Sequence, residues 1–195
     1  MQITLIRHGS TAGNALKQYI GTTDESLSEE GRLQAAAAGG DRTVGQVWVS
    51  SRRRTRETAQ LLFPEAEITE VKALDEMDFG EFEGKNYADL QSDPRYTQWV
   101  EGGCISACPG GESREEFSCR VCDAFEDIVH KLHARGEESA TFVVHGGTIM
   151  AIMARFALPQ KDYFTYQLKN CRGYICDCTV AEDGSITLTI LSRWN

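Results

Sequence analysis

Short apolar runs rich in β-branched residues alternate along this chain with longer stretches of helical periodicity. The runs at 2–6, 47–49 and 141–144 are typical of buried strands, and 67–71 is a weaker candidate. Strands that alternate with helices form a mostly parallel sheet covered on both faces. The alternation therefore predicts an α/β fold of three α/β/α layers.

The helical stretches carry clear start and stop signals. Ser28 precedes two glutamates and predicts a helix start, and Gly39 predicts the end of that helix. A second helix is predicted by Thr55, Thr58, Ala59 and Leu62, which share one helical face, and Pro64 ends it. Apolar residues at helical spacing predict a long helix over 112–134, and another begins at Gly147 and runs to about Ala157.

We expect one domain over residues 1–195, because no linker, repeat or low-complexity segment divides the chain. The stretch from about 83 to 111 is irregular and predicts an excursion over the active site, with short helices near 86–91 and 94–100. Alternation on both sides of Asp183-Gly184 predicts a terminal hairpin of 173–181 and 185–193.

Charge and hydropathy exclude several partner classes. The chain has 29 acidic and 20 basic residues, a net charge of −9, so general nucleic-acid binding is disfavoured. No apolar run approaches the roughly 18 residues of a membrane helix, so we expect no membrane partner. The first residues lack the pattern of a secretory signal, which predicts a cytoplasmic location. The oligomeric state stays open.

Seven cysteines without an export signal indicate reduced thiols. Cys104, Cys108, Cys119 and Cys122 loosely resemble a zinc site, but the first pair lacks the usual tight spacing. We expect Cys119 and Cys122 to pack on a helix as small apolar residues, and we expect no metal and no cofactor. A redox role of these thiols is left open.

Two histidines stand at the places where a parallel α/β sheet binds ligands. His8 and His145 each follow a predicted buried strand and precede a glycine, and ligands sit beyond the carboxyl ends of such strands. A neutral imidazole can attack phosphorus, and arginines beside it both favour the neutral ring and hold the phosphoryl group. Arg7 and one arginine of 52–56 could supply that clamp.

With these residues in place, the sequence resembles the histidine phosphatase superfamily, the phosphoglycerate mutase-like clan, over nearly its whole length. Residues 7–14 match the family's opening R-H-G-x-T-x-x-N. The further matches are 21–31 (G-x-x-D-x-x-L-x-x-x-G), 50–59 (S-x-x-x-R-A-x-x-T-A, with Thr55 in place of the usual alanine), 74–84 (L-x-E-x-x-F-G-x-W-E-G), 109–113 (P-x-G-E-S) and 144–148 (V-x-H-G-x).

The resemblance implies a role for each matched residue. His8 would be the nucleophile that is transiently phosphorylated, and Glu76 would protonate the leaving oxygen and then help to activate water. The phosphate pocket would be formed by Arg7, Arg54 and His145, joined by Asn14 and the Gly146 amide, with Thr22 near the substrate.

This sequence departs from the family pattern at Ser10, where many members have Glu or Gln, which limits what can be transferred about the substrate. Asp75 and Asp78 flank Glu76, so Asp78 is the second candidate for the acid.

Mutase members usually run longer, and Glu76 is followed here by Met-Asp-Phe-Gly, so hydrolysis of a small phosphomonoester is favoured over phosphoryl return. The run 79–87 and the segment 109–113 look most like the bacterial α-ribazole phosphatases of cobalamin synthesis, which makes α-ribazole 5′-phosphate a candidate substrate. The alternatives are phosphoglycerate mutase-type transfer and a non-catalytic phosphate-binding scaffold. A metal-dependent hydrolase is disfavoured, because the arginines would repel a divalent cation.

Overall fold

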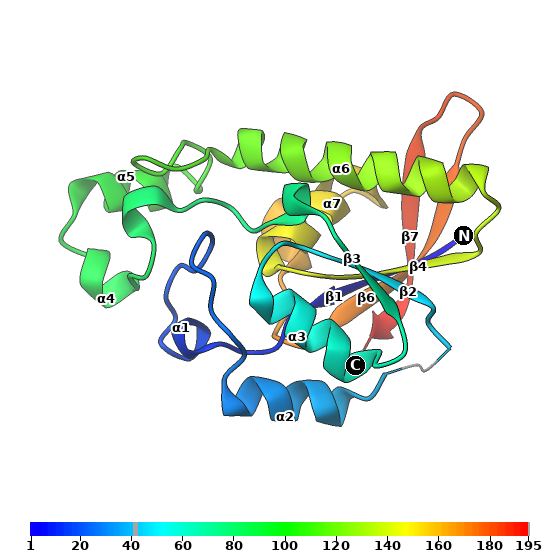
Figure 1. Ribbon diagram of the computed structural model, residues 1–195. Helices are drawn as coiled ribbons and strands as arrows, with labels where there is room; N and C mark the ends of the chain where they lie inside the picture. Colours follow the sequence, from blue (N-terminus) through cyan, green and yellow to red (C-terminus); the bar gives the residue numbers. More distant parts are fainter. Residues whose placement is uncertain (41–42, 195) are drawn as a thin grey trace.

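The computed structural model describes residues 1–40 and 43–194, and Figure 1 shows the arrangement of its helices and strands. Strands are labelled β, α-helices α and 3₁₀ helices η. In chain order the elements are β1 (Gln2–Arg7), α1 (Ala12–Ala15), α2 (Glu29–Ala38), β2 (Gln46–Val49), α3 (Arg53–Leu62), β3 (Glu67–Glu70), η1 (Lys72–Leu74), η2 (Gly80–Phe82), α4 (Tyr87–Leu90), α5 (Pro94–Glu101), α6 (Arg114–Ala134), β4 (Ser139–Val144), α7 (Gly146–Phe156), β5 (Ala157–Leu158), η3 (Tyr163–Tyr166), β6 (Gly173–Val180) and β7 (Ile186–Trp194).

The sheet has seven described strands in the order β3-β2-β4-β1-β6-β7-β5. Strands β3, β2, β4 and β1 run parallel to one another, as the sequence predicts for the centre of the sheet. On the other side β6 pairs antiparallel with β1, and the terminal hairpin of β6 and β7 follows. In β1, Leu5 lies between Phe142 of β4 and Tyr174 of β6, so the first strand is central.

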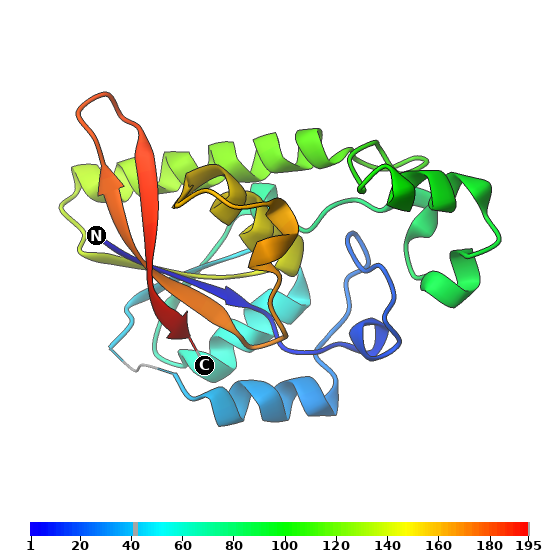
Figure 2. The same ribbon diagram turned by 180° about the vertical axis from the view of Figure 1, so that it is seen from behind.

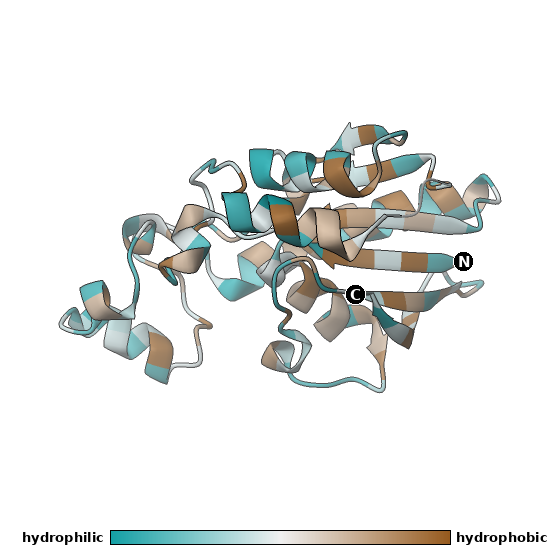
Figure 3. Ribbon diagram, turned by 90° about the horizontal axis from the view of Figure 1, so that it is seen from below, coloured by the Kyte–Doolittle hydropathy of each residue, from teal (hydrophilic) through white to brown (hydrophobic). Residues whose placement is uncertain are grey.

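Helices cover both faces of this sheet, which confirms the three-layer prediction. Figures 1 and 2 show α6 and α7 on one face and α2 and α3 on the other. Alternate residues of β1 serve the two cores: Ile3 and Leu5 pack on the α6 and α7 side, and Ile6 packs with α3. All three are fully buried. Figure 3 shows hydrophobic residues along the strands and hydrophilic residues on outer helix turns.

The long helix α6 forms where the sequence predicts it. Ser113 caps its start: the Ser113 hydroxyl accepts from the Glu116 N–H, and the Glu116 carboxylate accepts from the Ser113 N–H. Its buried side chains recur at helical spacing and face the core, and they are Phe117, Val121, Cys122, Phe125, Val129 and Leu132. Among the described residues, no helix combines the length and the apolar character needed to cross a membrane.

The segment between η2 and α6 leaves the sheet and carries α4 and α5, close to the predicted positions (Figures 1 and 2). An aromatic cluster anchors it. The Phe82 ring is fully buried, 5.5 Å from the Tyr96 ring and 5.7 Å from the Trp99 ring. Tyr19, from the loop after α1, adds a hydroxyl contact of 2.9 Å to Tyr96.

Three kinds of short element were not predicted. The four-residue helix α1 lies in a stretch expected to be turns, and Thr11 and Asn14 cap each other at its start. The two-residue strand β5 follows α7 directly and pairs with β7. The 3₁₀ helices η1 to η3 have three or four residues each. Elements this short show no periodicity in the sequence.

Candidate active site

His8 and His145 lie side by side at one edge of the sheet. They follow β1 and β4, which pair in parallel with Arg7 opposite Val144, so both strands end at the same level. The ring centroids are 5.1 Å apart and the ring planes are inclined by 69°. Parallel pairing therefore joins two motifs that are far apart in the sequence.

The surroundings of His8 fix its protonation. Nδ1 lies 2.7 Å from the Gly9 carbonyl oxygen, which can only accept, so Nδ1 carries the proton. Burial lowers the pKa of His8 well below the usual histidine value, and the charges of Arg54 and Arg7 lower this pKa further. His8 is therefore neutral at ordinary pH, with an unprotonated Nε2.

Arg7 lines the same cavity as His8. Its Nη1 donates to the carbonyl of Leu168, whereas its Nε is buried with no hydrogen-bond partner among the described residues. A Cβ on Gly146 would lie 3.3 Å from this Nε, so the glycine leaves room for the guanidinium. The unpartnered donor and the first N–H groups of α7 suit an anion.

Arg54 is fully buried beneath His145 and the loop that follows α1. Its Nε donates to Nδ1 of His145 at 3.3 Å. Its terminal nitrogens donate to three backbone carbonyls, those of Ile20, Gly21 and Thr23. Arg54 therefore supplies positive charge beside both histidines and orients His145.

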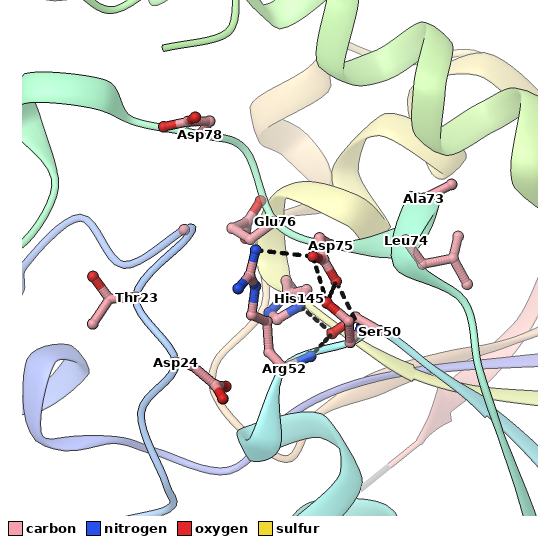
Figure 4. Close-up of polar contacts among 12 residues, drawn as sticks. Thr23, Asp24, Ser50, Arg52, Ala73, Leu74, Asp75, Glu76, Asp78 and His145 are labelled. Carbon is pink, nitrogen blue, oxygen red and sulfur yellow. Dashed lines mark hydrogen bonds and ion pairs between the residues drawn. The ribbon is translucent and has the colours of Figure 1, made fainter. Parts of the chain in front are cut away.

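A chain of hydroxyl groups holds the other nitrogen of His145. Because Nδ1 accepts from Arg54, the neutral ring carries its proton on Nε2, which lies 2.7 Å from Oγ of Ser50 (Figure 4). Oγ of Ser50 also lies 3.1 Å from Oγ1 of Thr55, and Thr55 Oγ1 donates to the Arg52 carbonyl at 2.8 Å. Burial lowers the pKa of His145 well below the usual range, and the charges of Arg54 and His8 lower it further.

Glu76 is the carboxylate that the structure places in the cavity with His8. The N–H of Met77 donates to Oε1 at 3.0 Å, and the N–H of Gly147 donates to Oε2 at 2.9 Å. Burial raises the pKa of Glu76, although these two bonds and the nearby arginines oppose the rise. A raised pKa suits a carboxyl group that must give up a proton and take one back.

Asp78, the second candidate for the acid, lies elsewhere. Its Oδ1 accepts from the N–H of Gly80 at 2.8 Å, and it does not line the cavity that contains His8. Figure 4 shows Asp78 apart from Ser50 and His145. Asp75 is also occupied, because it is buried against Ser51 and paired with Arg52 at 2.9 Å. The geometry thus favours Glu76.

The cavity beside His8 has a volume of about 380 Å³. Aromatic and sulfur-containing side chains form much of its wall. The lining residues are Arg7, His8, Asn14, Gln18, Tyr19, Ile20, Glu76, Met77, Phe79, Trp99, Cys104, Arg114, Gly146, Gly147, Met150, Tyr163, Phe164 and Gln167. Trp99 and Cys104 belong to the excursion, which therefore forms part of the wall.

Asn14 and Thr22 are both predicted to bind the substrate, but they lie in different hollows of the surface. Asn14 lines the cavity, and its Oδ1 accepts from Nδ2 of Asn170 at 3.2 Å. Thr22 is exposed and lines a neighbouring hollow, which shares only Glu76 with the cavity beside His8. Its role near the substrate stays a prediction.

Sequence reasoning did not assign a function to several residues around this site. Ser50 and Thr55 appear in a quoted motif, but nothing in the motif shows that their hydroxyls form a chain to His145. Tyr163, Phe164 and Arg114 come from segments without a motif role and reach the cavity only through the tertiary fold.

The cysteines occupy several environments. Cys119 and Cys122 lie on α6, as predicted, and Cys122 is buried there. Cys119 is exposed, so the prediction that it packs as a small apolar residue is wrong: its position falls on the solvent side of the helix. Burial raises the pKa of Cys122 to about 12. Within residues 1–40 and 43–194, no three side chains of His, Cys, Asp or Glu come together as a metal site would require.

Comparisons with known proteins agree with this fold. The model of the histidine phosphatase superfamily (branch 1) matches residues 3–188. An acid phosphatase of Mycobacterium tuberculosis is 32% identical over 185 residues, which cover 90% of this chain and 85% of the relative. A 2,3-bisphosphoglycerate-dependent phosphoglycerate mutase of Gloeobacter violaceus is 30% identical over 166 residues, 77% of this chain and 73% of the relative.

Among solved structures, the α-ribazole phosphatase of Shigella flexneri matches with a TM-score of 0.80 and 25% identity, over 98% of this chain and 96% of that one. The fold thus defines an α/β protein of the phosphatase and phosphoglycerate mutase type. This chain belongs to the histidine phosphatase superfamily, branch 1. The family and the relatives together indicate phosphatase activity.

Proposed function

We propose that this protein is a metal-independent phosphomonoesterase that forms a phosphohistidine at His8. The observation that carries the proposal is the state of His8: Nδ1 is bound to the Gly9 carbonyl, and burial with two arginines lowers the pKa, so Nε2 is free to act as a nucleophile. Arg7 and Arg54 supply the cationic surroundings that a phosphoryl dianion requires without a metal.

In the first step, Nε2 of His8 attacks phosphorus and the bond from phosphorus to the ester oxygen breaks. The carboxyl group of Glu76 gives its proton to the leaving oxygen, so the alcohol departs neutral. Arg7 holds the transferring group through its unpartnered Nε, together with the amide of Gly146. Arg54 and His145 complete the pocket.

In the second step, a water molecule attacks the phosphorus of phospho-His8. Glu76, now a carboxylate, takes a proton from that water as the bond from phosphorus to nitrogen breaks. Inorganic phosphate leaves, His8 returns to its neutral form, and Glu76 is again protonated. Each turnover therefore converts one ester and one water into an alcohol and phosphate.

We further propose a small phosphorylated metabolite as the substrate, with α-ribazole 5′-phosphate as the first candidate. The likeness to an α-ribazole phosphatase and the aromatic side chains along the cavity support this choice. The phosphoglycerate mutase relative makes phosphoryl transfer the second candidate. The two differ in the acceptor of the phosphoryl group, which is water in one case and a second hydroxyl group in the other.

The test is steady-state hydrolysis of a panel of small phosphomonoesters in EDTA, α-ribazole 5′-phosphate among them. We expect turnover with the wild type, none with His8→Ala, and full turnover with the control His133→Ala, because His133 is exposed on α6. An acid-labile, alkali-stable phosphoenzyme should form in the wild type and in His133→Ala, and not in His8→Ala. Loss of activity in EDTA, or persistence of activity in His8→Ala, would contradict the mechanism.

A further inference from the structure

The helix α6 places a second cation on the wall of the cavity that contains His8. Arg114 is the first residue of this helix and lines the cavity. Its Cζ lies 5.1 Å from the centre of the Tyr163 ring and 5.8 Å from that of Phe164, and its Nη1 donates to the Gly103 carbonyl at 3.1 Å. The guanidinium is therefore held in place from two sides.

Arg114 has no carboxylate partner within the described part of the chain. The ion pairs found there involve other cations, such as Arg120 of α6, which pairs with Glu112 just before that helix. The lining of the cavity contains two cationic side chains, Arg7 and Arg114, and one carboxylate, Glu76, which is already held by backbone N–H groups. Arg114 therefore presents to the cavity a positive charge that is not neutralised by an ion pair with a described carboxylate.

Tyr163 connects this cation to the reaction centre. Its hydroxyl donates to the Gly147 carbonyl at 3.3 Å, and the N–H of Gly147 holds Glu76. The guanidinium of Arg114 stacks on the ring of the same Tyr163. The Tyr163 side chain thus contacts both Arg114 and the carbonyl of Gly147, the residue that holds Glu76.

We propose that Arg114 determines specificity by binding a second negatively charged group on the alcohol part of the substrate, a carboxylate or a second phosphoryl group. The preferred substrates are phosphomonoesters whose phosphoryl oxygen and second anion are joined by a small apolar or planar body. On this proposal α-ribazole 5′-phosphate, whose alcohol part carries no second anion, is a poorer substrate than such esters. This proposal rests on the proposed phosphatase activity, because the phosphoryl group is placed at His8.

The strength of such a contact sets the expected effect. A hydrogen-bonded pair of guanidinium and carboxylate in a partly enclosed site changes affinity by roughly 10- to 100-fold. Because the second anion does not react, its loss should raise KM more than it lowers kcat.

Three aryl phosphates that differ at one position test the proposal: 4-carboxyphenyl phosphate, its neutral 4-carbamoyl analogue, and 4-(phosphonomethyl)phenyl phosphate. In Arg114→Gln we expect kcat/KM for the charged esters to fall by roughly 10- to 100-fold, while the neutral ester is unaffected. Arg114→Lys should recover part of the preference. The two charged esters compared with each other show whether the partner is a carboxylate or a phosphoryl-type anion.

Arg95→Gln is the matched control, since Arg95 is exposed, paired with Asp93 and Glu81, and outside the cavity. An equal loss on all three esters in Arg114→Gln, or no preference for charged esters in the wild type, overturns the proposal.

Calorimetric binding of 4-carboxybenzylphosphonate and 4-carbamoylbenzylphosphonate separates the two proposals, since neither compound needs turnover. If no ester is hydrolysed but the wild type prefers the carboxylate and Arg114→Gln does not, the phosphatase proposal fails and the role of Arg114 stands. If esters are hydrolysed without any binding preference, the role of Arg114 fails and the phosphatase proposal stands.

Discussion

The N–H of Gly147 donates a hydrogen bond to Oε2 of Glu76 at 2.9 Å, so the first turn of α7 holds the carboxyl group beside His8. Met77 secures the other oxygen. A Cβ on Gly147 would lie 2.2 Å from Oε1 of Glu76, which is closer than atoms can approach. The glycine therefore allows the backbone to position the acid.

Gly147→Ala should lower the activity without lowering the stability of the protein. The methyl group displaces Glu76, and we expect kcat to fall by about 10²-fold or more, the usual worth of a placed acid. The same change adds a good helix former to α7, worth up to about 1 kcal/mol, so unfolding in urea should not become easier. Gly45→Ala is the control, because a Cβ there meets no atom within 4 Å. Unchanged kcat in Gly147→Ala would refute the positioning role.

The plot of kcat/KM against pH should have two limbs: an acid limb set by His8 and an alkaline limb set by Glu76. As pH rises, kcat/KM should increase while His8 loses its proton, through a pKa lowered by burial, and then decrease while Glu76 loses its proton, through a pKa raised by burial. Activity is therefore greatest between these two pKa values.

Glu76→Gln should remove the alkaline limb and lower the rate on alkyl phosphates by about 10²- to 10⁴-fold. The loss should be smaller on 4-nitrophenyl phosphate, whose leaving group needs no proton. An alkaline limb that persists in Glu76→Gln would assign it to another group.

Removal of the Thr55 hydroxyl should disturb His145 through Ser50. Thr55 is fully buried, and Thr55→Val keeps its shape while removing the Oγ1 atom that contacts the Ser50 hydroxyl, at a cost of about 1–3 kcal/mol in stability. We expect a lower kcat and a changed tautomer population of His145, measured by nitrogen NMR of the imidazole. Thr97→Val, on the exposed side of α5, should leave both unchanged. An unaltered His145 spectrum in Thr55→Val would show that the hydroxyl chain has no influence on the ring.

Phe82→Ala should loosen the excursion that forms part of the cavity wall. The ring is fully buried against Tyr96 and Trp99, so its removal should cost about 3–5 kcal/mol in the free energy of unfolding. Val100→Ala, at an exposed position of α5, should cost less than about 0.5 kcal/mol. Urea denaturation of both variants measures the difference, and equal values would mean that the cluster does not anchor the excursion.

The sequence allowed most of the fold to be predicted where elements are long enough to show a period. The helix after Ser113 and the strands before His8 and His145 were found within a few residues of their ends. The short elements α1 and β5 were missed, because the four residues of α1 show no periodicity and β5 is defined by its pairing with the distant strand β7.

The candidate site likewise has one part that could be predicted from the sequence and one part that could not. The paired histidines follow from strand ends and parallel pairing, so their proximity could be predicted. The contacts of Arg54 with carbonyls of the loop before Asp24, and the approach of Tyr163 and Arg114, depend on side-chain packing between segments without shared motifs. No sequence pattern encodes such contacts.

The central position of β1 has a consequence during synthesis of the protein. This strand is made well before its neighbours in the sheet, because β4 and β6 follow it much later in the chain. Until then its apolar residues have no sheet partner, which exposes the nascent chain to misassociation and calls for chaperone protection. Gly147 can hold Glu76 beside His8 only after β4 and the start of α7 have been made. Chains truncated before that point should therefore have no hydrolase activity.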